Sequence, residues 1–91
     1  MTIRHEQLLD CGYKRRYDNV KEAEYENMLS SRVKLVATYY KDIDSWRVML
    51  MVRTNPENKD RSIFREVKSS KAKSFNEAYN ETIDWLQLYL N

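Results

Sequence analysis

The chain has 91 residues, which gives room for one domain with one hydrophobic core. A hydrophobic share of 42% argues against a disordered chain, and a charged share of 33% predicts a well-solvated surface. The formal net charge of +2 argues against an acidic mimic of DNA. We therefore expect a single compact domain over residues 1–91.

Cysteine usage and hydropathy favour the cytoplasm. Cys11 is the only cysteine, so we expect no disulfide within the chain and no multi-cysteine metal site. The N-terminal residues lack the apolar core of a signal peptide. The longest fully apolar run, residues 48–52, is far shorter than the roughly 20 residues of a membrane-spanning helix. These features predict a cytoplasmic protein with no membrane partner.

The first third of the chain predicts helices. Residues 3–11 have the pattern of a short helix, and the only glycine, Gly12, follows where a left-handed residue often ends a helix. Asn19 and Glu22 have the spacing of an N-cap and its N3 partner. This pair predicts a second helix that runs to about Leu29.

Strand patterns begin in the middle of the chain, although residues 13–17 are also compatible with an extended segment. Residues 32–40 and 46–53 alternate as strands do, and the short polar loop between them predicts a β-hairpin. Residues 54–60 contain the only proline and predict a turn. Residues 62–68 predict a third strand, whose apolar side chains on both parities require a bulge that the sequence does not locate.

The last predicted element is an amphipathic helix. Ser74 and Glu77 form a capping box, and apolar side chains follow at helical spacing from Phe75 to Leu90. This stripe would cover one face of the sheet. The predicted fold class is α+β: a three-stranded antiparallel sheet packed against a C-terminal helix, with N-terminal helical segments, in the order α-(α)-β-β-β-α.

Positive charge is concentrated in residues 59–73, which carry six lysines and arginines against two acidic residues. On a sheet face that the helix leaves free, arginine can pair with guanine and lysine with phosphate. The leading hypothesis is a non-catalytic nucleic-acid-binding accessory or regulatory protein, with DNA preferred to RNA. Its predicted contacts are Arg47, Arg53, Arg61, Arg65, Lys68, Lys71 and Lys73.

The same free face allows other interpretations. Tyr40, Met49 and Met51 would lie on it, and adaptable thioethers are common at protein-binding surfaces. The alternative function is therefore an inhibitor or adaptor, of the kind that phages and mobile elements encode, that binds a host protein. An exposed antiparallel face is also normally polar without any partner. A third hypothesis is a homodimer formed through a strand edge or through Trp85 and Leu88.

Catalytic chemistry has little support in the sequence. His5 is the only histidine, so it has no second histidine at a metal-binding spacing. Asp42 and Asp44 could contact a divalent ion, although two loop aspartates are a common turn signal. One glycine cannot supply a glycine-rich phosphate loop. We expect neither an enzyme nor a bound cofactor or metal.

Three family resemblances each cover no more than half of the chain. The run WRVMLMVRT, with the segments that follow it, resembles the three-strand-plus-helix arm-site-binding domain of tyrosine recombinases, which implies a sheet in a DNA groove. The segment KSSKAK resembles the start of the last helix in double-stranded-RNA-binding domains, which implies lysine contacts to phosphate. The run SFNEAYNETIDWLQLYL is similar to the helix of HicB-type antitoxins. No family is assigned from these resemblances.

Overall fold

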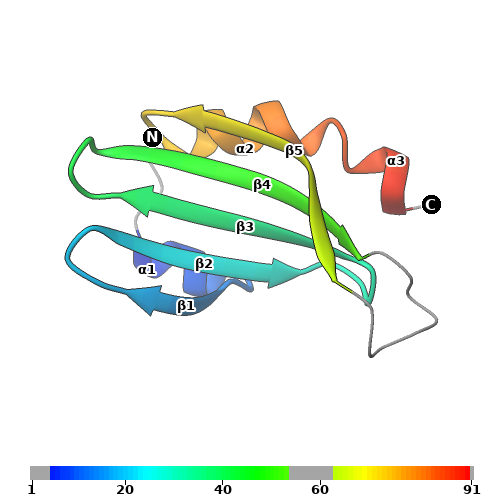
Figure 1. Cartoon of the computed structure of the whole chain (residues 1–91), viewed down its shortest axis with the longest axis horizontal. Coiled ribbons are helices and arrows are strands. Elements are labelled where there is room, and N and C mark those ends of the chain that lie inside the picture. Colours follow the sequence, from blue (N-terminus) through cyan, green and yellow to red (C-terminus); the bar gives the residue numbers. More distant parts are fainter. Residues whose placement is uncertain (1–4, 54–62, 91) are drawn as a thin grey trace.

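The computed structural model describes residues 5–53 and 63–90, which form one five-stranded antiparallel sheet with helices along one side (Figure 1). Each strand pairs with the next one in the chain, so β1 and β5 are the two edges. The elements are α1 (His5–Asp10), β1 (Lys14–Asp18), β2 (Glu22–Met28), β3 (Val33–Tyr40), β4 (Ser45–Arg53), β5 (Phe64–Ala72), α2 (Phe75–Ile83) and α3 (Gln87–Leu90).

The predictions of a three-stranded sheet and of a second N-terminal helix are both wrong. The residues between α1 and β3 form two further strands, β1 and β2. In β2, Ala23 and Tyr25 are fully buried and alternate with half-buried polar residues. Asn19 shapes the turn between the two strands, because its side-chain oxygen accepts from the backbone N–H groups of Lys21 and Glu22, each at 2.9 Å. An N-cap uses the same acceptor geometry, which is why the sequence pattern indicated a helix.

Gly12 ends α1, the described part of the first predicted helix, in the way expected from the sequence. Its φ of 94° lies in the left-handed region that favours glycine. The Leu8 carbonyl accepts from the N–H groups of Cys11, at 3.1 Å, and Tyr13, at 3.0 Å. This reversal brings Tyr13 into the core at the start of β1.

The predicted hairpin is confirmed as β3 and β4, and β5 contains the bulge that the sequence required. Leu50 pairs with Lys68, whereas the next residue, Met51, pairs with Glu66. Val67 is therefore the extra residue, and its half-buried side chain packs against the core. Because of this extra residue, odd-numbered residues of β5 face the helices before the bulge and even-numbered residues face them after it. This switch explains why the apolar residues of the predicted strand did not follow one alternation.

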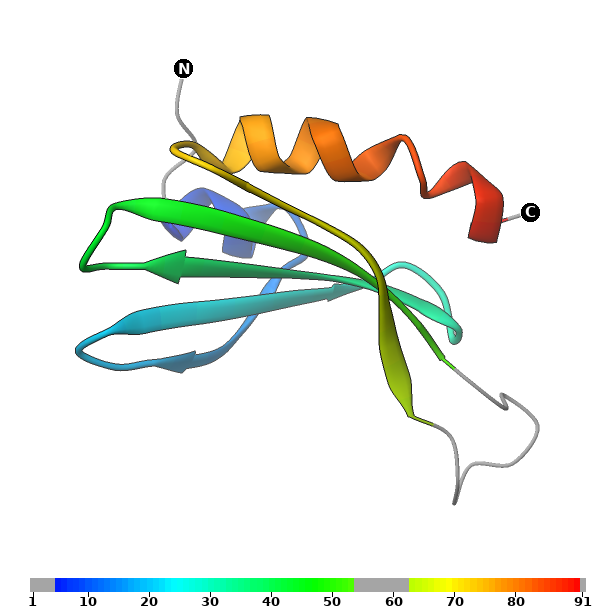
Figure 2. The same ribbon diagram turned by 45° about the horizontal axis from the view of Figure 1, so that its top comes forward.

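The core lies between the sheet and the helices. Trp46, Val48 and Leu50 of β4 are buried there, and α2 lies across β4 and β5 as predicted (Figure 2). Phe75, the first residue of α2, meets the ring of Trp46 edge to face at 5.5 Å and that of Tyr13 at 5.8 Å. These perpendicular contacts tie the N-terminal region, the sheet and the C-terminal helix together.

The C-terminal helix has the N-cap half of the predicted capping box and is shorter than predicted. The Ser74 hydroxyl accepts from the Glu77 N–H at 3.2 Å, as an N-cap does. The helix stops at Ile83 and does not run on to the C-terminus in one piece. The buried Thr82 hydroxyl lies 2.9 Å from the Ala78 carbonyl, and such bonds to the preceding turn bend helices. Within the two described ranges, no helix is long and apolar enough to cross a membrane.

Candidate interaction surface

In the described part of the chain, both longer helices lie on one side of the sheet (Figure 2). Leu8 of α1 shares a core with Phe75 of α2, and neither helix covers the opposite side. We call that opposite side the open face. Its side chains are Lys14, Arg16 and Tyr17 of β1; Glu22, Glu24, Glu26 and Met28 of β2; Lys34, Val36, Thr38 and Tyr40 of β3; Ser45, Arg47, Met49, Met51 and Arg53 of β4; and Phe64, Glu66, Ser69 and Lys71 of β5.

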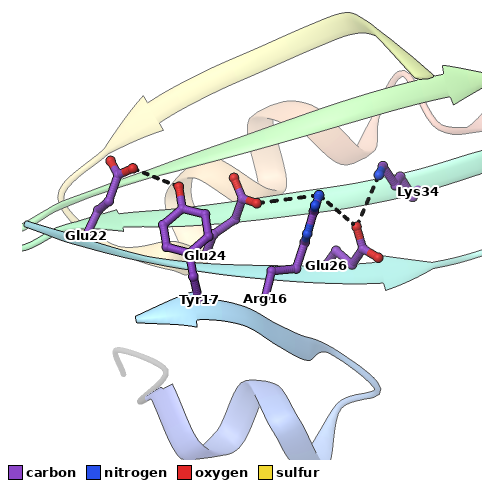
Figure 3. A network of polar contacts seen from close by, with 6 residues as sticks. All are labelled: Arg16, Tyr17, Glu22, Glu24, Glu26 and Lys34. Carbon is purple, nitrogen blue, oxygen red and sulfur yellow. Dashed lines mark hydrogen bonds and ion pairs between the residues drawn. The ribbon is translucent and has the colours of Figure 1, made fainter. Parts of the chain in front are cut away.

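Strand β2 places a row of three glutamates on the open face, Glu22, Glu24 and Glu26 (Figure 3). The Arg16 guanidinium lies 3.7 Å from the Glu24 carboxylate and 3.4 Å from that of Glu26. The Lys34 ammonium lies 3.1 Å from the Glu26 carboxylate. Glu26 therefore connects the basic side chains of β1 and β3 across its own strand.

The first glutamate of the row is paired with a tyrosine. The Tyr17 hydroxyl donates to the Glu22 carboxylate at 2.7 Å (Figure 3). This hydrogen bond stabilises the neutral phenol, and burial and the nearby Glu24 charge act in the same direction, so the pKa of Tyr17 is raised to about 12. All three carboxylates of the row thus have a partner on the open face.

Strands β4 and β5 supply the more basic part of the open face. The Arg47 guanidinium donates to the Glu66 carboxylate at 2.7 Å. The ring of Phe64 lies beneath two cations, with its centroid 4.3 Å from the Lys34 ammonium and 4.8 Å from the Arg53 guanidinium. Each of these three cations therefore has a carboxylate or an aromatic partner.

A small apolar centre lies among these charged groups. Val36 and Thr38 are only 2% and 4% exposed, although no described helix covers them. Met49 and Met51 beside them are half-buried. Long charged side chains cover apolar surface with their stems while their heads reach water. The open face is consequently a mosaic of paired charges around an apolar centre.

The residues predicted to contact nucleic acid do not all share one surface. Arg47, Arg53 and Lys71 lie on the open face. Arg61 lies outside the described residues, as does the predicted turn over residues 54–60. The open-face part of the predicted set is therefore three residues.

Two other members of the set point toward the helix side of β5. Arg65 pairs with a helix-side residue of β4, and the Lys68 ammonium lies 5.4 Å from the ring centroid of Trp85. The Lys73 ammonium donates to the Ile43 carbonyl at 2.9 Å, which holds the turn between β3 and β4. The sequence stretch is continuous, but its side chains alternate between the faces of an edge strand.

The residues predicted for a protein partner do share one surface. Tyr40, Met49 and Met51 all lie on the open face, where they are half-buried. Trp85 and Leu88, considered for self-association, are 41% and 69% exposed near the junction of α2 and α3. The protein-binding set is thus assembled by the sheet, on the opposite side from the two candidate dimer residues.

Sequence reasoning missed the acidic contribution of β2. The signal was the alternation Glu-Ala-Glu-Tyr-Glu over residues 22–26, which has the period of a strand. It also missed a cavity of about 220 Å³ on the helix side, between α1, α2 and the sheet. That cavity is lined by residues from distant parts of the sequence, such as Leu8, Leu35 and Phe75.

The aspartates considered for a metal lie in the turn between β3 and β4. Asp44 has a positive φ of 47° and accepts a hydrogen bond from the Tyr39 hydroxyl at 2.5 Å. Asp42 is exposed. Among the residues that the structure describes, no group of three or more histidine, cysteine or acidic side chains could hold a metal ion. The His5 side chain lies outside that part.

No family model, curated protein or solved structure matches this chain. The fold also departs from the partial resemblances noted in the sequence, because the sheet has five strands in consecutive order. The candidate function therefore depends on the chemistry of the surface itself.

Proposed function

We propose that this chain is a non-catalytic protein-binding domain, an adaptor or inhibitor, whose interface is the open face. The observation that carries the proposal is the row of Glu22, Glu24 and Glu26 beside the basic side chains of β3 and β4. A nucleic acid lying over this face would bring its phosphates against the carboxylates, which repel them. A protein surface with the complementary arrangement of charges would be attracted to both parts.

The apolar centre of the open face supports the same proposal. Specific protein interfaces have an apolar centre within a polar rim, and methionine, aromatic residues and arginine are enriched in them. Met49 and Met51 supply the centre, and Phe64 with Arg53 supplies an aromatic–cation pair at one end. The cross-strand pairs hold the surrounding side chains in place before binding, which lowers the ordering cost of association.

A second candidate function is phosphate binding along the edge strand β5, with DNA preferred to RNA. Arg65, Lys68 and Lys71 have no carboxylate within 4.0 Å in the described part of the chain. Cations without a carboxylate partner at a sheet edge are available to phosphates. In this arrangement the nucleic acid would follow the edge of the sheet and leave the glutamates of β2 uncovered.

Fluorescence anisotropy with labelled duplex DNA, single-stranded DNA and duplex RNA at two salt concentrations tests the proposal. We expect the wild-type chain to show no micromolar binding at about 0.15 M salt. The triple variant Glu22→Gln, Glu24→Gln, Glu26→Gln should gain salt-sensitive binding, because repulsion is removed while the basic side chains remain.

Two other results would indicate nucleic-acid binding, each at a different place on the sheet. Micromolar binding by the wild-type chain that is lost in Arg47→Glu would place nucleic acid on the open face and overturn the proposal. Binding that is lost in the double variant Arg65→Glu, Lys68→Glu but kept in Arg47→Glu would support the edge of β5, which is the second candidate.

A further inference from the structure

Strand β4 presents a regular row of side chains on the open face. The row has an arginine at each end and two half-buried methionines between them, in the order Arg47, Met49, Met51 and Arg53. The two arginines lie about 20 Å apart along the strand, because a strand rises by about 3.3 Å per residue. A partner that lies along β4 would therefore meet positive charge at both ends and apolar side chains between them.

The cations around this row outnumber the carboxylates. Among the residues that the structure describes, β4 and β5 place one carboxylate on the open face, that of Glu66, and three cations, Arg47, Arg53 and Lys71. Arg47 is bonded to Glu66, whereas Arg53 and Lys71 have no carboxylate within 4.0 Å in the described part of the chain. Both lie near aromatic rings, at 4.8 Å and 5.9 Å from the ring centroids. A ring does not neutralise a cation, so a carboxylate of a partner can still pair with each of them.

The backbone of β4 limits the kind of segment that can bind along it. Its hydrogen-bonding groups are paired with β3 on one side and with β5 on the other. An extended segment binds by adding to a sheet edge, so it cannot pair with β4. A helix satisfies its backbone groups internally and can lie on a sheet face. Its diameter of about 10–12 Å corresponds to two or three strands spaced about 4.8 Å apart.

The glutamates of β2 determine which flank of such a helix can be acidic. Glu22, Glu24 and Glu26 lie on the open face two strands away from β4. They would repel acidic side chains on the flank of the helix that faces β2. Acidic side chains are therefore favoured on the flank that faces β5, and neutral or basic side chains on the other flank.

We propose that the open face binds an amphipathic helix of the partner protein, which lies along β4. Its apolar stripe meets Met49 and Met51, and the acidic side chains of its β5-facing flank meet Arg53 and Lys71. This inference rests on the function proposed above, and it adds the chemistry of the partner segment.

Two designed helical peptides test the charge of the partner. Each has about 18 residues, which makes it about as long as β4. The acidic peptide has a leucine stripe with glutamate on one flank and glutamine on the other, and the basic peptide has lysine in place of every glutamate. Fluorescence anisotropy at about 0.15 M salt should show micromolar binding of the acidic peptide to the full chain and binding of the basic peptide at least about tenfold weaker. In spectra of the chain labelled with ¹³C-methyl methionine, the acidic peptide should shift the signals of Met49 and Met51.

Two double variants distinguish this site from a general attraction to basic side chains. Arg53→Gln with Lys71→Gln removes two cations from the open face and should weaken binding of the acidic peptide about tenfold. Arg65→Gln with Lys68→Gln removes the same charge from the helix side of β5, so it is the matched control. It should change the affinity less than about twofold, because exposed charges at a distance are screened by salt. Thermal unfolding confirms that both variants are folded.

Several results would overturn the inference: no micromolar binding of the acidic peptide, tighter binding of the basic peptide, equal weakening by the two double variants, or unshifted signals of Met49 and Met51 at saturation. A chain that is dimeric by light scattering and becomes monomeric in Met49→Lys would assign the open face to a second copy, and would also overturn it. The function proposed above would survive these peptide results if a cross-linker at position 49 still captured another protein.

Discussion

The Lys34 ammonium lies 3.1 Å from the Glu26 carboxylate and joins β3 to β2 on the open face. Their side chains are 11% and 24% exposed, so the pair is well shielded from water. The same ammonium lies 4.3 Å from the ring centroid of Phe64 on β5. One cation therefore links the acidic strand β2 to the opposite edge of the sheet, and it holds the two parts of the candidate interface in register.

Removing the carboxylate of this pair should destabilise the fold. We expect Glu26→Ala to lower the free energy of unfolding by about 1–2 kcal/mol, because it leaves the shielded Lys34 ammonium without its acceptor. Glu24→Ala is the control and should cost less than about 0.5 kcal/mol, since its partner Arg16 is 51% exposed and 3.7 Å away. Urea unfolding followed by tryptophan fluorescence measures both. Equal losses would contradict a special role for Glu26.

The turn between β1 and β2 should depend on one side chain. Asn19 accepts from two backbone N–H groups, and its own N–H donates to the Glu22 carbonyl at 2.9 Å. Asn19→Ala should therefore cost about 1 kcal/mol, whereas Val20→Ala, at a side chain that is 91% exposed, should have no measurable effect. Thermal unfolding gives the comparison, and a tolerated Asn19→Ala would argue against this turn.

The Tyr17–Glu22 hydrogen bond should give a pH dependence at high pH. The pKa of Tyr17 is raised from 10.0 to about 12 in the folded chain, because the neutral phenol is the form that donates. The stabilisation is therefore complete below about pH 10 and is lost as the pH rises toward 12. NMR titration of ¹³C-labelled tyrosine should show the raised pKa. Glu22→Gln should return it toward 10, and an unchanged value would contradict the bond.

Gly12 should resist substitution for a backbone reason. A Cβ at this position would lie 3.6 Å from the Asn27 side-chain oxygen, which is an ordinary contact, but the φ of 94° strains any L-residue. We expect Gly12→Ala to lower the free energy of unfolding by about 1–2 kcal/mol. Gly12→Asn should cost less, because asparagine tolerates positive φ better. Chemical denaturation compares the variants, and a neutral Gly12→Ala would refute the strain.

Short sequence patterns were sufficient to predict an element where only one backbone conformation was compatible with them. Gly12 could end a helix only by adopting positive φ, and Ser74 had a helical apolar stripe directly after it. The alternation over residues 46–53 could form only a strand with one buried face. These elements were predicted correctly because each pattern depends only on residues that are close together in the sequence.

The β1–β2 hairpin could not be identified in the same way. Asn19 satisfies an N-cap and a hairpin turn with the same side-chain acceptor, so the choice depends on the partners of the flanking residues. Residues 14–18 are all exposed on an edge strand and show no apolar alternation. Because this hairpin was missed, the row of glutamates was missed too, and the open face was expected to be more basic than it is.

The cavity had no local signal at all. Leu8, Leu35 and Phe75 each have the character of ordinary core residues, and a space between them arises only from the final packing of α1, α2 and the sheet. The buried Tyr13 hydroxyl, which has no hydrogen-bond partner in the described part of the chain, is likewise a property of the assembled structure. Sequence patterns predict which side chains are buried, but they do not predict where burial leaves space.

The proposed function requires that the open face binds a protein. A photo-reactive benzoylphenylalanine in place of Met49 tests it in an extract of the cells from which the chain comes, with the same substitution at Asn80, an exposed residue of α2, as the control. We predict a discrete cross-linked protein from position 49 that survives nuclease treatment and is absent from position 80. Nuclease-sensitive products from position 49, or the same products from both positions, would contradict the account.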